Sequence, residues 1–304
     1  MIYTCTLNPA IDYRLLVSNF EVGKLNRSTS SKFMAGGKSI NVSIVLNELN
    51  TKNIATGFLG GFTGMYLKKY LTDTLKLDTN FIEVSGFTRI NIKLLSNDIE
   101  TEINQESPNI EDKDFQKLTN LIDHMETLDI LICGGSSVKG IDNIYEKIAI
   151  HCQKKKIEFI IDTTKSDLAQ VLPYGPLLVK PNIHELQEFF GVNIRTLDET
   201  IKYGKKLLEL GAKNVIVSLG GKGSIFVNKD LTLRAKAIVG EVKNPVGAGD
   251  SMVAGFISSY TLDKDIIKAY KLAIACASAT AFSPTIGTKS EIEQLLPSVE
   301  IENI

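Results

Sequence analysis

A glycine-rich turn directly before a carboxylate is the clearest sign of chemistry in this chain. It lies in NPVGAGDSMVAGF, residues 244–256, where Asp250 is followed by residues with helical spacing. The turn consists of Gly247, Ala248 and Gly249. Backbone N–H groups at a helix N-terminus lack intrahelical partners and, with the helix dipole, favour an anion. The turn could therefore hold a phosphoryl group while Asp250 accepts the proton of an attacking hydroxyl, although helix capping is the alternative role for Asp250.

A second glycine-rich segment resembles part of a different phosphate-binding motif. GGKS at 36–39 is similar to the end of a P-loop, and EFIID, which ends at Asp162, is similar to a Walker B strand. The complete P-loop pattern needs glycine at position 32, where this chain has Lys32, and the preceding STSSKFMA is too polar for a buried parallel strand. No G-x-G-x-x-G follows a strand either, so the sequence favours phosphate chemistry on other loops.

Composition limits the classes of partner. The 304 residues include 34 Lys and Arg against 35 Asp and Glu, a formal net charge of -1, so we expect no nucleic-acid partner. No segment approaches the roughly 20 apolar residues of a membrane span, and the N-terminal residues do not have the pattern of a secretory signal; we expect a cytoplasmic protein with no membrane partner. The four cysteines form no C-x-x-C pair, which predicts buried free thiols and neither a disulfide framework nor a zinc site.

Apolar strand-like segments alternate with helical patterns along most of the chain. From residue 128 onward these segments are LDILIC, IEFIID, LLVK and NVIVSL, and the N-terminal third contains IYTCTL and NIATGFL. A helix between the last two is indicated by apolar residues at i, i+3, i+4 and i+7, namely Val42, Val45, Leu46 and Leu49. Near-continuous apolar strands separated by helices predict a parallel sheet covered on both faces.

Two segments break this alternation. Residues 13–35 have no helical period, and residues 87–103 alternate between apolar and polar residues across a predicted SND turn. In the second segment one face carries Ile90, Ile92 and Leu94, and the other carries Arg89, Asn91 and Lys93. We interpret both segments as antiparallel strands of a small sheet that covers a pocket; a solvated outer face is the alternative.

Six segments together resemble the PfkB, or ribokinase-like, family of sugar kinases. They are TLNPAID (6–12), GGKSIN (36–41), TRINIKL (88–94), KPNIHEL (180–186), SLGGKGS (218–224) and NPVGAGDS (244–251). The likeness is strongest to the branch that contains 1-phosphofructokinase and tagatose-6-phosphate kinase. It implies one ribokinase-like domain over residues 1–304, an α/β fold of three α/β/α layers with a mostly parallel central sheet. A small β-sheet lid would come from about residues 12–36 and 87–105.

The resemblance also implies roles for individual residues. Asp250 would be the catalytic base, with Gly247, Ala248 and Gly249 as the anion hole. The implied sugar ligands are Asp12, Gly37 and Asn41; the implied ligands of the phosphate already on the sugar are Lys38, Arg89 and Arg27; further pocket contacts are Asn91, Asn104 and Ser136. The implied nucleotide-binding residues are Lys180, Asn182, Glu185, Ser218, Gly220, Gly221 and Gly223, of which Glu185 would organise Mg²⁺ through water.

The implied reaction is the ATP- and Mg²⁺-dependent phosphorylation of fructose 1-phosphate on its 6-hydroxyl, giving fructose 1,6-bisphosphate. Tagatose 6-phosphate is the alternative substrate, and a sugar-phosphate sensor without turnover is the alternative from another class. Closure of the lid would exclude water from the transferred group. Lid sheets in this branch commonly pair between subunits, so the resemblance implies a homodimer.

Three positions depart from the family pattern. Ser39 replaces a glycine, where a serine would be strained if the backbone needs a positive φ, or would cap the helix that follows. Ser107 stands where glycine is usual, and Val138 where proline is common. These departures bear on the geometry of the lid and of Ser136.

Overall fold

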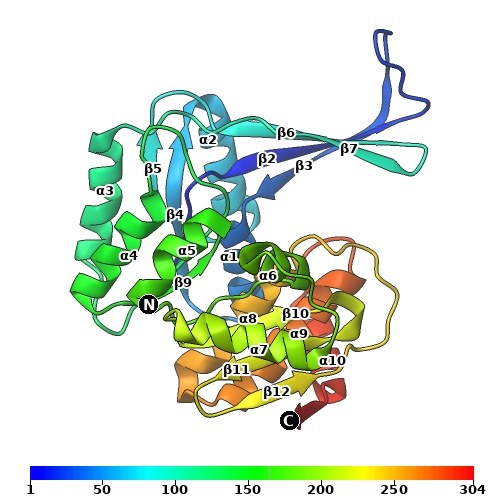
Figure 1. Ribbon diagram of the computed structural model, residues 1–304. Coiled ribbons are helices and arrows are strands. Elements are labelled where there is room, and N and C mark those ends of the chain that lie inside the picture. The colour runs from blue at the N-terminus through cyan, green and yellow to red at the C-terminus, as the bar shows by residue number, and fades with distance from the viewer. Residues whose placement is uncertain (164) are drawn as a thin grey trace.

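Five parallel strands form the centre of the protein in the computed structural model, which describes residues 1–163 and 165–304, Lys165 by its backbone alone (Figure 1). Their order is β5-β4-β1-β8-β9. The bounds are β1 (Ile2–Thr6), β4 (Asn53–Gly60), β5 (Asp78–Val84), β8 (Ile130–Gly134) and β9 (Glu158–Asp162). Every neighbouring pair is parallel, as the sequence predicted. The carboxyl ends of all five strands therefore lie at one edge of the sheet.

The sheet continues beyond β9 through a short extended segment. Leu178 bridges to Ile160 of β9, and Val179 bridges to Val215 of β10. The predicted strand LLVK thus makes only isolated bridges, because Pro176 and Pro181 on either side interrupt the ladder. An antiparallel group in the order β10-β11-β12-β13 follows: β10 (Asn214–Ser218), β11 (Ser224–Asn228), β12 (Thr232–Ala235) and β13 (Ile301–Asn303).

Helices cover both faces of this sheet, and the alternation along β8 shows how. Ile130 and Ile132 pack in the core formed with α1 (Lys38–Glu48), α8 (Ala248–Asp263) and α9 (Ile266–Phe282), whereas Leu131 and Cys133 pack in the core formed with α3 (Asp112–Asp123) and α4 (Ile144–Lys155). The first layer consists of α1 (Lys38–Glu48), α2 (Gly61–Lys69), η1 (Tyr70–Thr74), α8 (Ala248–Asp263), α9 (Ile266–Phe282), α10 (Lys289–Leu295) and η4 (Leu296–Ser298). The second consists of α3 (Asp112–Asp123), α4 (Ile144–Lys155), α5 (Lys165–Val171), η2 (Leu172–Tyr174), α6 (Ile183–Phe190) and α7 (Leu197–Glu209). The predicted three-layer fold is confirmed.

A separate four-stranded sheet extends from the body of the protein as the lid (Figure 1). Its order is β3-β2-β6-β7, with bounds β2 (Ala10–Val17), β3 (Ser28–Gly36), β6 (Arg89–Ser96) and β7 (Ile99–Ile103). Asn97 and Asp98, both at positive φ, close the predicted turn between β6 and β7. Each predicted segment forms an antiparallel pair, β2 with β3 and β6 with β7. The two pairs are joined by β2 and β6, which run parallel with Asp12 opposite Asn91, and the sequence did not predict this.

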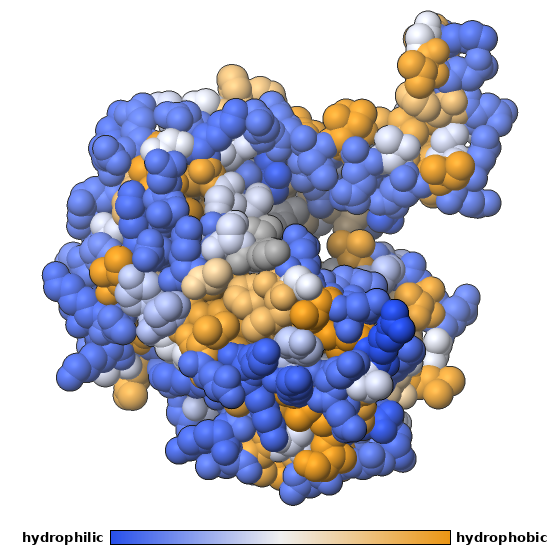
Figure 2. All heavy atoms as spheres, in the orientation of Figure 1, coloured by the Kyte–Doolittle hydropathy of each residue, from blue (hydrophilic) through white to orange (hydrophobic). Residues whose placement is uncertain are grey.

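The surface view shows a largely hydrophilic face that is hollowed between the body and the lid (Figure 2). No helix among the described residues is long and apolar enough to cross a membrane. All four cysteines are buried and free, which confirms the prediction made for them. The hollow beneath the lid, at the carboxyl ends of the parallel strands, is therefore the candidate site.

Candidate active site

The glycine turn of the GAGD segment begins α8. Gly247 is the N-cap residue, with a φ of 83° that favours glycine. Ser251 N donates the first backbone hydrogen bond of the helix, to Gly247 O at 2.8 Å, so the N–H groups of Gly249 and Asp250 precede the helical ladder. A Cβ atom on Gly249 would lie 2.8 Å from Lys180 Nζ. Glycine therefore lets an ammonium group approach the anion-binding backbone closely.

Asp250 lies in the first turn of α8 but does not cap it, since no side-chain cap hydrogen bond is present at this helix end. Its side chain is buried and accepts a hydrogen bond from Asn41 Nδ2 at 2.8 Å. Burial, and then the charge of Asp162, raise the pKa of Asp250 to about 6, against the opposing effects of Asn41 and nearby lysines. A buried carboxyl with a pKa close to neutral is suited to accept a proton from a hydroxyl.

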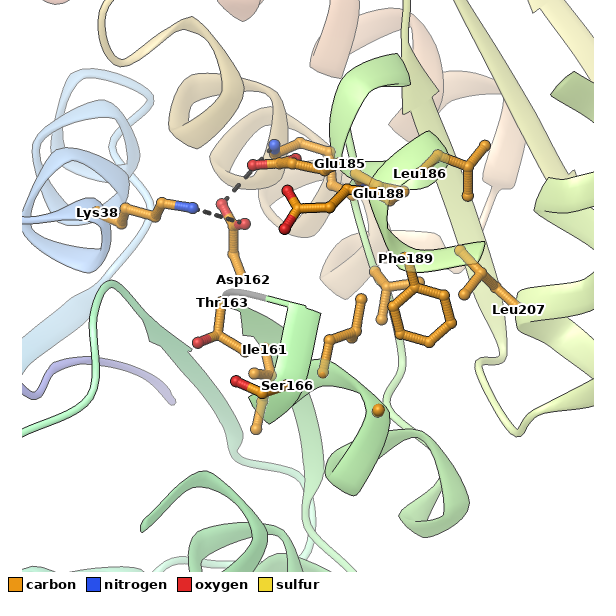
Figure 3. Close-up of a pocket in the computed structure, with 15 residues that line it drawn as sticks. Lys38, Ile161, Asp162, Thr163, Ser166, Glu185, Leu186, Glu188, Phe189 and Leu207 are labelled. Atoms are coloured by element: carbon orange, nitrogen blue, oxygen red, sulfur yellow. Dashed lines mark hydrogen bonds and ion pairs between the residues drawn. The ribbon is translucent and has the colours of Figure 1, made fainter. Parts of the chain in front are cut away.

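Asp162 joins two lysines beside Asp250, and the sequence had suggested it only as part of a rejected Walker B resemblance. Lys38 Nζ lies 3.0 Å from its Oδ1, and Lys180 Nζ lies 3.7 Å from its Oδ2 (Figure 3). Burial alone would raise the pKa of Asp162, but Lys180 and Lys38 outweigh it and lower that pKa. The missed signal was its place at the end of β9, where central parallel strands present ligand-binding groups.

The lid brings Asp12 and Arg89 to the same hollow, whereas Asn91, predicted as a pocket contact, is buried against Asp12 and does not line the cavity. Asn91 on β6 donates from Nδ2 to Asp12 Oδ1 on β2 at 2.9 Å, across the parallel register. Arg89 donates to two backbone carbonyls, those of Gln105 at 3.3 Å and Asn8 at 3.1 Å, and its buried Nε has no partner among the described residues. Burial lowers the pKa of Arg89. The guanidinium is thus held in place while donors remain for an anion.

A cavity of about 510 Å³ contains most of the predicted catalytic and sugar-binding residues. Those that line it are Asp12, Gly37, Lys38, Asn41, Arg89, Ser136, Gly247, Gly249 and Asp250, and Lys180, predicted for the nucleotide, joins them. Residues that the sequence analysis did not assign also line it: Asn8, Gly135, Asp162 and Val246. Residues drawn from positions 8 to 250 therefore meet in one volume large enough for a sugar phosphate.

Two predicted sugar-phosphate ligands lie elsewhere. Arg27 is exposed in the loop between β2 and β3, beyond the end of the lid strands. Asn104 is also exposed, and its Nδ2 donates to Glu102 Oε2 at 3.2 Å. Neither lines the cavity within this chain. The lid strands carry Arg27 away from the body of the protein, whereas Asn104 follows the end of β7 at which Ile103 pairs with Ile92, and its side chain is bonded to Glu102.

The predicted nucleotide-binding residues lie on two neighbouring elements. Asn182 and Glu185 form a capping box at the start of α6, in which Asn182 Oδ1 accepts from Glu185 N at 2.9 Å and Glu185 Oε2 accepts from Asn182 N at 2.8 Å. Ser218 ends β10, and the glycines that follow form the exposed turn η3 (Gly220–Lys222) and its cap Gly223. The two residues of the capping box therefore have a structural role whatever else they bind.

A second cavity, of about 590 Å³, adjoins the first (Figure 3). The two share Lys38, Asp162 and Lys180 in their linings. The second also reaches Glu185 and an apolar wall formed by Leu168, Ala169, Val179, Leu186, Phe189 and Leu207. The Lys38–Asp162–Lys180 cluster therefore stands at the junction of two hollows.

The GGKS segment is not a P-loop, and its Ser39 is neither strained nor a helix cap. It follows β3, a lid strand, and not a strand of the parallel sheet, so the P-loop interpretation is excluded. Ser39 lies in α1 without a positive φ, and Gly37 is the N-cap residue at φ 136° with no side-chain cap bond. Ser39 is therefore neither strained nor a cap, and its buried Oγ has no hydrogen-bond partner among the described residues.

Comparison with known proteins agrees with this geometry. The model of the pfkB family carbohydrate kinases matches residues 5–293. A 1-phosphofructokinase from Bacillus subtilis (strain 168) is 42% identical, and a D-tagatose-1-phosphate kinase from Bacillus licheniformis is 34% identical, each over 100% of both chains. A structure of phosphofructokinase-2 from Escherichia coli in complex with substrates and products superposes with a TM-score of 0.90 at 25% identity, over 98% of both chains. The chain belongs to the pfkB family of carbohydrate kinases.

Proposed function

We propose that this protein transfers the γ-phosphoryl group of ATP to the 6-hydroxyl of fructose 1-phosphate, giving fructose 1,6-bisphosphate. The observation that carries the proposal is the single cavity in which Asp250 and the glycine turn of α8 face Asp12 and Arg89. The relatives named 1-phosphofructokinase and D-tagatose-1-phosphate kinase support a ketohexose 1-phosphate as the substrate class. Tagatose 1-phosphate is therefore the second candidate, and tagatose 6-phosphate a third.

The lid side of the cavity binds the sugar phosphate in this proposal. Asp12, oriented by Asn91, accepts hydrogen bonds from sugar hydroxyls, and Gly37 and Asn41 contact the same ring. Arg89 binds the existing phosphate, because its guanidinium has donors to spare and no ion pair among the described residues.

The α8 side carries out the transfer. Asp250 accepts the proton of the attacking hydroxyl as that oxygen bonds to the γ-phosphorus and the bond to the leaving ADP breaks. The N–H groups of the glycine turn hold the phosphoryl oxygens. Lys38 was expected to bind the existing phosphate, but its ion pair with Asp162 supports a place beside the transferred group, together with Lys180.

The nucleotide lies in this proposal along the loop 218–223 and the start of α6, and its phosphates point toward Lys180. No three acidic, His or Cys side chains gather to hold a metal ion in the part of the chain that the structure describes. Mg²⁺ does not need such a cluster, because it keeps most of its water and binds largely to nucleotide phosphates. Glu185 and Asp162, which line one cavity, would hold its waters, and the ion would neutralise charge on the phosphates.

The lid supports a homodimer. Its strands and the loop between β2 and β3 expose large apolar side chains, namely Leu16, Phe20, Val22, Leu25, Phe33, Ile99 and Ile103. An exposed apolar sheet of this kind is favourably covered by a second copy. Light scattering tests the proposal, and a monomer at micromolar concentration would contradict it.

The proposed activity is tested by following ADP release with Mg²⁺-ATP and one sugar phosphate at a time. The panel is fructose 1-phosphate, fructose 6-phosphate, tagatose 1-phosphate and tagatose 6-phosphate. We expect the highest kcat/KM with fructose 1-phosphate. A preference for either tagatose phosphate would keep the chemistry and change the substrate, whereas tight binding without ADP release would support the sensor.

The rate should depend on the ionisation of Asp250. Because the base must be ionised and its pKa is raised to about 6, kcat/KM for the sugar phosphate should fall as the pH drops through about 6 and reach a plateau above it. The measurement is a pH profile at saturating Mg²⁺-ATP. A profile that stays flat through that region would show that Asp250 does not titrate in the catalytic step.

A further inference from the structure

Asn8 lines the 510 Å³ cavity and was not among the residues predicted from the sequence. It follows β1 and is only 5% exposed. Its Nδ2 donates to Ser136 Oγ at 3.1 Å, and its Oδ1 is buried without a hydrogen-bond partner among the described residues. A buried unpaired acceptor costs stability, so a carboxamide retained in this state calls for a functional explanation.

The bond from Asn8 fixes the direction of the Ser136 hydroxyl. A serine hydroxyl has one proton and two lone pairs, and it normally serves as donor or acceptor as the partner requires. Here one lone pair is taken by the Asn8 N–H, and Ser136 Oγ has no further partner in the described part of the chain. Since Ser136 is exposed to the cavity, its proton is left to donate to a ligand.

The same residue also holds the arginine of the site. The backbone carbonyl of Asn8 accepts from Arg89 Nη2 at 3.1 Å. Asn8 therefore touches two groups, a hydroxyl and a guanidinium, which both present donors to the same cavity. A group that only accepts hydrogen bonds and carries negative charge matches this pair, and a phosphate does so.

We propose that Asn8 is a positioning residue for the phosphate already on the substrate. Its carboxamide holds Ser136 as a donor toward that phosphate, and its carbonyl aligns Arg89 beside it. The inference rests on the proposed function and deepens it, because it names the residue that organises the phosphate subsite without touching the reacting atoms.

Two substitutions of Asn8 distinguish this role from simple packing. Asn8→Ala removes the Nδ2 donor, so Ser136 is free to point elsewhere. Asn8→Asp keeps the shape of the side chain but cannot donate; it accepts the Ser136 proton and adds a negative charge near the phosphate. We expect KM for fructose 1-phosphate to rise about tenfold in Asn8→Ala and about a hundredfold in Asn8→Asp, with kcat and KM for ATP within about threefold of the unaltered protein.

A milder effect of the near-isosteric aspartate than of alanine would show that Asn8 only fills space. A double-mutant cycle adds a second readout: if the Asn8 side chain acts through Ser136, the combined Asn8→Ala and Ser136→Ala variant should be no worse than Ser136→Ala alone. The inference is overturned if the losses of the two single variants multiply in the double variant, or if aspartate has a milder effect than alanine.

Failure of the proposed function can be distinguished from failure of the inference about Asn8. If the unaltered protein releases no ADP with fructose 1-phosphate, the proposed phosphorylation of that sugar fails, and the same variants are compared by calorimetric binding of fructose 1-phosphate. The order unaltered, alanine, aspartate in rising Kd would still support the role of Asn8. Equal Kd values in all three proteins, or an unaltered protein that binds no fructose 1-phosphate, would overturn it.

Discussion

Replacing Asp250 with asparagine should lower kcat for fructose 1-phosphate by about 10²- to 10⁴-fold while the protein stays folded. A fall of this size is expected when a positioned general base is removed. Folding should persist because an asparagine Oδ1 can still accept the hydrogen bond that Asn41 donates to Asp250. The measurement is ADP release at saturating Mg²⁺-ATP, and the control is Asp263→Asn at the other, exposed end of α8, which should retain full activity.

The thermal midpoint of the same variant gives an independent check. The folded pKa of Asp250 lies above its usual value, so the ionised form is disfavoured in the folded protein and lowers stability at pH values above about 6. Removing the charge should leave the midpoint at pH 8 unchanged or raise it. A variant that loses activity together with its midpoint would reflect unfolding, and a kcat within about threefold of the unaltered value would exclude Asp250 as the base.

Replacing Arg89 with methionine should raise KM for fructose 1-phosphate by about 10²-fold or more, while KM for ATP changes by no more than about threefold. The partly buried guanidinium is held by two carbonyls and, in the proposed site, presents forked donors to the phosphate. Arg89→Lys should recover only part of the loss, because an ammonium cannot reproduce that fork.

The control for Arg89 is Arg14→Met, on the neighbouring lid strand β2. Arg14 is partly exposed and its nearest carboxylate contact, with Glu100, is 4.0 Å long. Its loss should have little effect on either KM. Equal effects at the two arginines would mean that the lid attracts the sugar phosphate through its overall charge and not through a specific subsite.

Much of the fold was predictable because its strands are buried on both faces. Segments such as LDILIC and IEFIID have apolar residues at nearly every position, which is the signature of a covered parallel strand. The lid was predictable from its alternation. The parallel pairing of β2 with β6 was not, because no local pattern records which strands 79 residues apart will meet.

The site was predictable where the chemistry lies within one segment. The GAGD turn contains both its glycine backbone and its carboxylate, so its spacing suggested a phosphoryl site, and the family resemblance then favoured a catalytic role for Asp250 over helix capping. Asp162 and Asn8 were missed because their roles depend on partners from distant segments, Lys38 and Lys180 for the first and Ser136 for the second. Arg27 shows the converse, since its residue type suits a phosphate but its loop lies at the far end of the lid.

The hydrogen bond between Asn41 and Asp250 joins residues 209 positions apart, and this separation matters during biosynthesis. The lid and α1 leave the ribosome early, whereas α8 follows near the end of translation. A nascent chain that stops before α8 has the proposed sugar ligands without the proposed base or glycine turn. In the proposed mechanism, interrupted synthesis or proteolytic removal of the chain from α8 onward thus yields fragments that cannot transfer the phosphoryl group.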